Sequence, residues 1–261
     1  MSGIGQEVPP MVAIPSLKGH VSDEEWTQRV ELAATYRLVS MYGWDDMIFT
    51  HISARVPGPQ HHFLINPYGL MFEEITASSL VKIDVDGNTL QDSPFPVNPA
   101  GFTIHSAVHM HREDAHCVIH LHTLDGAAVS AQADGLMPLT QHAMVIHGDV
   151  AYHDYEGVAL DLDERERLVN DLKDRHLMIL RNHGTLAVGK TCGDAFLRMY
   201  FLERACSMQV RAQGASLNRP NQGVPEKTAV RGGLVGGDYL SMLAWPALLR
   251  KLDRADPSYK N

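Results

Sequence analysis

The sequence has few cysteines, no long apolar run and little positive charge. Its three cysteines, Cys117, Cys192 and Cys206, are odd in number and scattered, which excludes a disulfide framework as the basis of the fold. No apolar run reaches the roughly 18 residues that span a membrane, and residues 1–20 lack the basic start and apolar stretch of a secretory signal. We therefore expect a cytoplasmic protein with reduced, buried thiols and no membrane partner.

The charge balance argues against nucleic-acid binding. The 22 lysines and arginines are outnumbered by 31 aspartates and glutamates, giving a net charge of -9, whereas nucleic acids and anionic membranes usually need a concentrated positive field. What the chain does have in abundance is histidine, with 15 in 261 residues. Histidine is the commonest metal ligand and an acid or base near neutral pH. A constellation of histidines is therefore the feature to look for.

Short strands and amphipathic helices alternate through most of the chain. Ser22 and Glu25 form a capping box ahead of the first helix. Helices are expected over 23–42, 100–112, 124–132, 163–174 and 191–211, and strands over 48–56, 62–69, 80–90, 117–122, 149–153, 176–182 and 185–189. Tight-turn signals such as Asp86-Gly87 exclude a purely parallel sheet. We expect an α/β protein, a three-layer α/β/α domain with a mixed, largely antiparallel central sheet.

Three regions are predicted along the chain. Residues 1–21 form an N-terminal arm and residues 22–214 the α/β/α domain. Residues 215–261 combine a mobile Gly/Pro/Asn-rich loop over 215–233 with a C-terminal helical segment that packs on the same or a neighbouring subunit. Proline disrupts helix interiors, so Pro246 is expected to kink or split that segment.

The stretch VIHLH contains the first candidate metal ligands. On a strand, residues two apart share a face, so His120 and His122 point into one space. The RNHG stretch places His183 at the end of another strand. Three neutral imidazoles and a water make a catalytic zinc arrangement. The residues alone do not place His183 beside the other two, and unrelated, hydrogen-bonded histidines remain the alternative.

A rival pair lies on the predicted helix before this strand. His105 and His109 are four residues apart and so share a helix face. The residues between them include no glutamate, so the zinc-protease pattern HExxH is absent. We favour His105 as a group behind the site or in the core.

Several motifs in order resemble the class II aldolase/adducin head family. They are VIHLHT at 118–123, RNHG at 181–184, NPAGFTIH at 98–105 and GDVAYHDYEG at 148–157, and the resemblance runs from about 24 to 212. It implies an α/β/α fold and one divalent metal ion per subunit, held by His120, His122 and His183. It also implies a ring-shaped homotetramer with sites at subunit interfaces.

Departures from this family's sequence pattern narrow the range of possible substrates. Its sugar-phosphate aldolases carry a Ser-Ser-Glu run whose glutamate is the catalytic acid/base, and the matching positions here are Pro99, Ala100 and Gly101. Their phosphate-binding asparagine and Thr-Gly pair match His51 and Tyr68-Gly69. Because most hydroxyl and amide donors to phosphate are lost, the chain resembles a glutamate-lacking branch that does not use sugar phosphates.

His142 is the predicted replacement for the missing carboxylate. It matches a catalytic tyrosine of the aldolases, and an imidazole with a pKa of about 6.5 exchanges protons at neutral pH without tuning. The predicted substrate-lining residues are His51, Tyr68, Gly69, Asn98, Gln141, Tyr239 and Arg250. Arg181 or Arg250 is a candidate partner for a substrate carboxylate.

These features predict a divalent-metal-dependent carbon-carbon lyase, a decarboxylase or retro-aldolase, that acts on a small non-phosphorylated oxo, hydroxy or aromatic acid. Decarboxylation makes its carbanion without a base, so the missing glutamate favours it. Zinc is the expected metal, with manganese or iron as alternatives. Two other functions remain open: an adducin-like, non-catalytic interaction protein, and a non-haem iron oxygenase on the same scaffold.

Overall fold

The computed structural model describes residues 14–158, 163–214, 216–236 and 238–261 of the chain. Within these residues, seven strands form one sheet in the order β3-β2-β1-β4-β7-β6-β5. The strands are β1 (His51–Arg55), β2 (Phe63–Ile65), β3 (Val81–Ile83), β4 (Cys117–Leu121), β5 (Val150–His153), β6 (Leu177–Leu180) and β7 (Gly184–Gly189). The β5–β6 pair is parallel and the other neighbouring pairs are antiparallel. The mixed, largely antiparallel sheet is thus confirmed.

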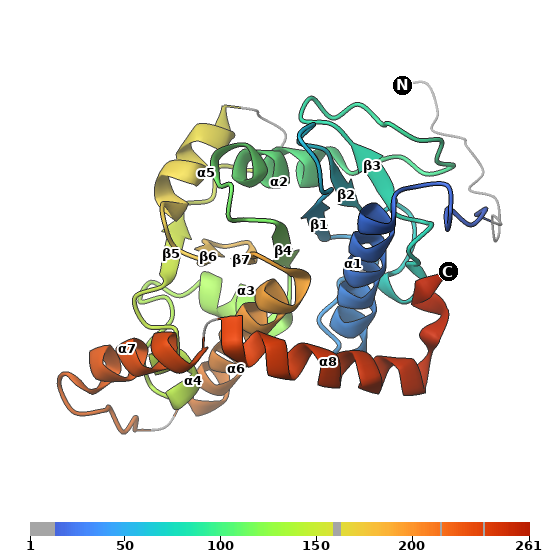
Figure 1. Cartoon of the computed structure of the whole chain (residues 1–261). Coiled ribbons are helices and arrows are strands. Elements are labelled where there is room, and N and C mark those ends of the chain that lie inside the picture. The colour runs from blue at the N-terminus through green and yellow to red at the C-terminus, as the bar shows by residue number, and fades with distance from the viewer. Residues whose placement is uncertain (1–13, 159–162, 215, 237) are drawn as a thin grey trace.

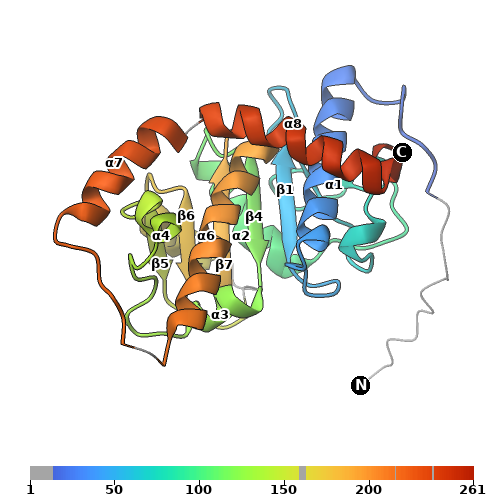
Figure 2. The same cartoon turned by 90° about the horizontal axis from the view of Figure 1, so that it is seen from below.

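Helices cover both faces of this sheet, as expected for a three-layer α/β/α fold (Figure 1). One face carries α2 (Pro99–His111) and α5 (Glu164–Leu172). The other carries α1 (Asp23–Met41), α3 (Leu124–Ser130), α6 (Cys192–Ala212) and α8 (Asp238–Ala255), and Figure 2 looks onto α6 and α8 where they lie across the strands. The remaining helices are α4 (Gln141–Val145), α7 (Val224–Gly236) and the short turns η1 (Phe72–Glu74) and η2 (Pro257–Lys260).

Strand β4 shows how the sequence directs its side chains to the two layers. Ile119 and Leu121 belong to the core cluster under α1 and α6. Val118 belongs to the cluster under α2 and α5. Because side chains alternate along a strand, His120 shares the α2 side with Val118. This alternation directs the His120 side chain to the α2 side of the sheet, near the C-terminal end of β4.

Capping side chains set the ends of the long helices where the sequence predicted them. The Ser22 hydroxyl accepts a hydrogen bond from the Glu25 N–H at 3.1 Å. The Thr191 hydroxyl accepts one from the Asp194 N–H at 3.0 Å, at the start of α6. Each cap satisfies an amide that would otherwise lack a partner.

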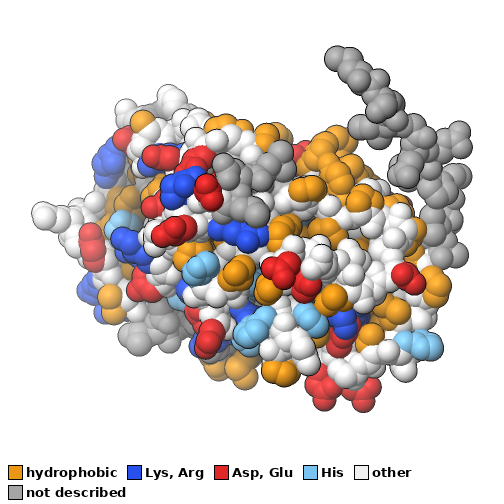
Figure 3. Space-filling view, turned by 90° about the horizontal axis from the view of Figure 1, so that it is seen from above, with side chains coloured by type: hydrophobic (Ala, Val, Ile, Leu, Met, Phe, Trp, Pro, Cys, Tyr) orange, Lys and Arg blue, Asp and Glu red, His pale blue; other side chains and the backbone are white. Residues whose placement is uncertain are grey.

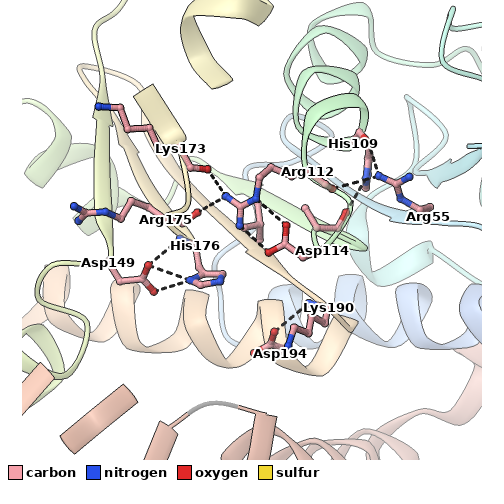
Figure 4. Close-up of polar contacts among 12 residues, drawn as sticks. Arg55, His109, Arg112, Asp114, Asp149, Lys173, Arg175, His176, Lys190 and Asp194 are labelled. Atoms are coloured by element: carbon pink, nitrogen blue, oxygen red, sulfur yellow. Dashed lines mark hydrogen bonds and ion pairs between the residues drawn. The ribbon is translucent and has the colours of Figure 1, made fainter. Parts of the chain in front are cut away.

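The end of α2 is tied to the loop between α5 and β6 by Arg112 (Figure 4). Its guanidinium makes two 2.8 Å contacts with the Asp114 carboxylate and donates to the backbone carbonyl of Arg175 at 2.9 Å. Beside it, the His176 ring lies 3.0 Å from an Asp149 oxygen. These contacts hold α2, with its histidines, against the sheet.

One expectation for the C-terminal region was wrong, and one of the two alternatives for Pro246 does not hold. The mobile loop predicted over 215–233 contains the start of α7, which begins at Val224 and packs against α4. Pro246 does not split the last helix, because α8 runs through it from Asp238 to Ala255. Pro246 is exposed, and so is Met242, the residue whose backbone carbonyl loses its amide partner.

Two properties of the structure concern possible membrane and nucleic-acid partners: the character of its helices and the distribution of charge on its surface. Among the described residues, no helix combines the length and apolar character needed to cross a membrane. On the face that carries α2 and α5, acidic and basic side chains are interspersed (Figure 3).

Candidate metal centre

The structure brings the three histidines of the VIHLH and RNHG stretches together. His120 lies on β4, His122 follows its last residue, and His183 lies in the turn between β6 and β7. The Nε2 atoms of His120 and His122 are 3.0 Å apart, and those of His122 and His183 are 2.8 Å apart. One ligand atom from each ring lies within 4.8 Å of the others, so the three can hold a metal ion.

The RNHG turn has the conformation needed to aim His183. Asn182 has a φ of 56°, in the left-handed region that asparagine tolerates better than most residues. Its N–H donates to the Ser130 carbonyl, and the His183 N–H donates to the Ser130 hydroxyl, both at 3.1 Å. A β-carbon on Gly184 would lie 2.3 Å from the Leu121 carbonyl oxygen, so only glycine permits this approach of β7 to β4.

Hydrogen bonds at the outer nitrogens orient two of the rings. Nδ1 of His120 donates to the Thr185 carbonyl at 3.0 Å, and Nδ1 of His122 donates to the Asp46 carboxylate at 3.3 Å. A carbonyl and an ionised carboxylate only accept, so each neutral ring carries its lone pair on Nε2. Two lone pairs facing each other at 3.0 Å repel unless a cation lies between them. The donor set therefore fits a divalent ion held by neutral imidazoles.

The rings are in the protonation state that a metal requires. Burial lowers the pKa of His120 well below its ordinary range, with a further contribution from the neighbouring His183. Burial also lowers the pKa of His122, against the opposing effect of Asp46, and lowers that of His183 to about 4. Neutral imidazoles bind metal without first releasing a proton.

A cavity of about 400 Å³ opens beside these histidines. Three predicted substrate-lining residues, His51, Tyr68 and Asn98, contribute to its wall. Gly69 does not line it, and a β-carbon on Gly69 would lie 3.2 Å from the ring of Phe95. The other lining residues are Phe49, Thr50, Ile104, Tyr155, Gly157 and Val158.

Four other predicted residues lie elsewhere in the chain. His142, on α4, packs its ring 5.4 Å from that of Phe201, measured between centroids. Its neighbour Gln141 is exposed, as are Tyr239 and Arg250 on α8. None of these four lines the cavity of its own chain. A role for His142 in catalysis stays a prediction that requires a neighbouring subunit.

Arg181 was a candidate partner for a substrate carboxylate, but its guanidinium is engaged away from the cavity. It donates to the Gln132 carbonyl at 3.1 Å. It also stacks over the ring of Tyr152, with 4.6 Å from its central carbon to the ring centroid.

Two residues of the site, Asp46 and Thr50, had no signal in the sequence, and a third, Tyr155, lies within the GDVAYHDYEG motif. Asp46 reaches His122 from a loop 76 residues earlier in the chain. Tyr155 is half exposed at the cavity, with its ring centroid 6.0 Å from that of His183. Thr50 has a φ of 68°, which strains a β-branched residue, and its buried hydroxyl has no partner among the described residues. Strain of this kind gathers at functional sites.

A buried acid supports the centre from behind. The Thr185 residue that holds His120 through its carbonyl also donates its hydroxyl to Glu203 of α6 at 2.7 Å. The Thr123 hydroxyl donates to the second oxygen of the same carboxyl group. Burial raises the pKa of Glu203 to about 7, although both hydroxyl contacts lower it. Glu203 thus links α6 to the strands that present the metal ligands.

Comparisons with known proteins agree with this geometry. Residues 30–210 match the model of the Class II Aldolase and Adducin N-terminal domain. A Caulobacter vibrioides protein named after class 2 aldolases is 58% identical over 253 residues, covering 94% of this chain and 96% of that protein. The crystal structure of an aldolase II superfamily protein from Pseudomonas syringae superposes with a TM-score of 0.90 at 49% identity, covering 95% of this chain and 100% of that one. Mouse alpha-adducin is 46% identical over 186 residues, which are 70% of this chain and 25% of that protein.

Proposed function

Because the chain belongs to the class II aldolase and adducin N-terminal domain family, we propose that it is a divalent-metal-dependent carbon-carbon lyase. Its ligands are His120, His122 and His183, with one ion per subunit. One observation carries the proposal. The Nε2 lone pairs of His120 and His122 face each other at 3.0 Å, while the Nδ1 atom of each ring donates a hydrogen bond to an acceptor. In a purely structural cluster of histidines, an N–H of one ring would instead face the lone pair of the next ring.

Zinc is the proposed metal, with manganese and iron as alternatives, because three imidazoles suit all three ions. Such a metal, when bound, polarises a substrate oxygen and stabilises the negative charge left by a breaking carbon-carbon bond. The chain's own contribution is to hold the three rings neutral and oriented, through Thr185 and Asp46.

The proposed substrate is a small, non-phosphorylated oxo, hydroxy or aromatic acid. The cavity of about 400 Å³ suits a small molecule. Among the described residues that line it, none is lysine or arginine, and His51 and Tyr68 stand at positions that resemble the aldolases' phosphate donors. A phosphate would find few donors in such a wall.

Decarboxylation fits the site better than retro-aldol cleavage, because it needs no carboxylate base and only a later proton donor. Tyr155 offers a phenol hydroxyl within the chain itself. His142 offers an imidazole if α4 of a neighbouring subunit reaches the cavity, as a homotetramer with sites at its interfaces would allow. We therefore propose Tyr155 and His142 as alternative proton donors.

The proposal is tested with zinc-loaded and manganese-loaded protein against a panel of small oxo, hydroxy and aromatic acids, following release of carbon dioxide and of carbonyl products. We expect turnover of at least one acid and its loss in His183→Gln. The matched variant His116→Gln changes an exposed histidine that does not line the cavity and should keep full activity. Fully loaded protein that turns over none of the panel contradicts the lyase. Oxygen uptake by iron-loaded protein would instead support the oxygenase.

The second candidate is a non-catalytic interaction module. The identity with alpha-adducin over 186 residues favours it. An interaction module would need no metal for its role. Full retention of its binding to a partner by a metal-free His120→Ala variant would support it.

A further inference from the structure

Behind the cavity, three histidines and a serine form an unbroken chain of hydrogen bonds into the core. Nδ1 of His51, at the cavity wall, lies 2.8 Å from Nε2 of His105. Nδ1 of His105 contacts the hydroxyl of Ser53, which lies 2.7 Å from Nε2 of His109. The chain ends at the backbone carbonyl of Ala115, 3.0 Å from Nδ1 of His109.

Local structure explains why these side chains meet. His51 and Ser53 are two apart on β1 and so share the face that α2 covers. His105 and His109 are one helical turn apart on α2. The antiparallel register of β1 with β4 sets His51 opposite His120, and their ring centroids are 5.0 Å apart. One end of the chain of hydrogen bonds is therefore at the metal centre.

The carbonyl at the inner end fixes the direction of every proton in the chain. A carbonyl only accepts, so a neutral His109 carries its proton on Nδ1 and accepts on Nε2. The Ser53 hydroxyl must then donate to His109 and accept from Nδ1 of His105. By the same accounting, His105 accepts on Nε2 and His51 donates from Nδ1. The one remaining lone pair is on Nε2 of His51.

These proton positions hold only if each ring carries a single proton, and burial of the rings supplies this condition. His51, His105 and His109 are at most 5% exposed. Burial lowers the pKa of His105 well below its ordinary range and that of His109 to about 3. Nearby Arg55 lowers the pKa of His109 further, and its guanidinium donates to the backbone carbonyl of His109 rather than to the ring (Figure 4).

We infer that this chain holds Nε2 of His51 as an unprotonated hydrogen-bond acceptor at the cavity, and that the site selects ligands carrying a hydroxyl group beside the metal-bound oxygen. Nε2 of His51 has no hydrogen-bond partner among the described residues and is not a fully buried atom. His51 is then a specificity-determining residue. His105, Ser53 and His109 are positioning residues that act through it.

This inference rests on the proposed metal centre and narrows its substrates to hydroxy acids. An oxo group in the same place would present lone pairs to the lone pair of His51 and gain nothing. A hydroxyl donates to it, whereas a ligand that covers this acceptor without donating to it leaves it unpaired, which is costly. Through His51, the chain of hydrogen bonds thus gives a hydroxy acid a higher affinity than an analogue that lacks the hydroxyl donor.

The tautomers are tested by imidazole ¹⁵N NMR of histidine-labelled, metal-free protein, assigned with single His→Gln variants. We expect His51, His105 and His109 all to carry their proton on Nδ1. In Ser53→Ala, His105 loses its acceptor and can donate from Nε2, so His51 should shift to the Nε2–H form while His109 stays unchanged. The control Ser106→Ala removes a buried serine whose hydroxyl donates to carbonyls of its own helix and should change none of the three. An Nε2–H form of His51 in the unmodified protein overturns the inference.

Selectivity is tested by calorimetry with glycolate and methoxyacetate, which differ in the hydroxyl donor, on zinc-loaded protein. We expect glycolate to bind about fivefold tighter or more in the unmodified protein and in Ser106→Ala. The ratio should fall to about one in Ser53→Ala. Equal affinities in the unmodified protein, or binding of neither acid, overturn the substrate assignment. Because the NMR experiment needs no metal, failure of the metal centre and failure of this inference give different results.

Discussion

The imidazole of His51 fills the space directly over the α-carbon of Gly101, where a β-carbon would lie 2.8 Å from its ring. No larger side chain fits at 101 while His51 keeps this place. The His51 ring on β1 thus leaves no room for a glutamate side chain at position 101, near the start of α2.

Gly101→Ala should destabilise the protein although alanine is the better helix former by about 1 kcal/mol. The methyl group would displace the His51 ring, and overpacking typically costs about 1–3 kcal/mol. In a His51→Ala background the same change should become stabilising. Urea unfolding of the four proteins in this cycle measures the coupling. Additive effects would contradict the contact.

Gly184→Ala should weaken zinc binding by tenfold or more, on the order of the effect of disturbing a ligand's support. Its β-carbon would lie 2.3 Å from the Leu121 carbonyl and 3.1 Å from the His122 ring. Gly189→Ala is the matched control, because at the other end of β7 its β-carbon would lie 2.4 Å from a backbone nitrogen of α6. Both should lower stability, but chelator competition should show a loss of zinc affinity only in the first. Similar zinc affinities would argue against the placement of Gly184.

Asp46→Asn should weaken zinc binding about tenfold, because the carboxylate orients His122 and increases its basicity. The control is Asp45→Asn, whose carboxylate lies near the Ser40 hydroxyl instead. Competition with a fluorescent zinc chelator compares the two. A loss of affinity as large in the control would mean that charge in this loop, rather than the contact with His122, is responsible.

His109 should make the metal-free protein acid-sensitive. Its pKa is about 3 in the folded state, against an ordinary value of 6.5. Between these values the unfolded chain binds a proton that the folded protein does not, so the free energy of unfolding rises with pH up to about 6.5 and falls in acid. His109→Gln should reduce this slope by up to about 1.4 kcal/mol per pH unit. Urea unfolding from pH 4.5 to 7 measures it, with the exposed His20→Gln as control. An unchanged slope in His109→Gln would contradict the buried, neutral ring.

Local patterns together with the family resemblance were enough to single out the three candidate metal ligands. The two-residue period of β4 put His120 and His122 in one space, and the RNHG motif supplied His183 by resemblance. The remainder of the site depends on contacts between distant segments. The approach of Asp46 to His122 and the register of His51 with His120 are set by loop geometry and strand pairing. Periodicity within one segment carries no information about either.

The missed helix α7 shows how a local signal can mislead. The glycine, proline and asparagine residues of the stretch 215–233 predict a loop, and glycine in particular lowers helix propensity. In the structure, a β-carbon on Gly232 would lie 2.8 Å from a methyl group of Val145 on α4. The glycine therefore permits close packing of α7 on α4, and that packing outweighs the propensity.

The most direct test of the central claim is metal content by elemental mass spectrometry on tag-free protein. Unmodified protein is compared with His122→Ala and with the exposed-site control His116→Gln, and circular dichroism verifies that each is folded. We predict about one divalent ion per chain in the unmodified and control proteins and its loss in His122→Ala. Folded, unmodified protein that binds no metal even after supplementation with zinc, manganese and iron would contradict the three-histidine centre.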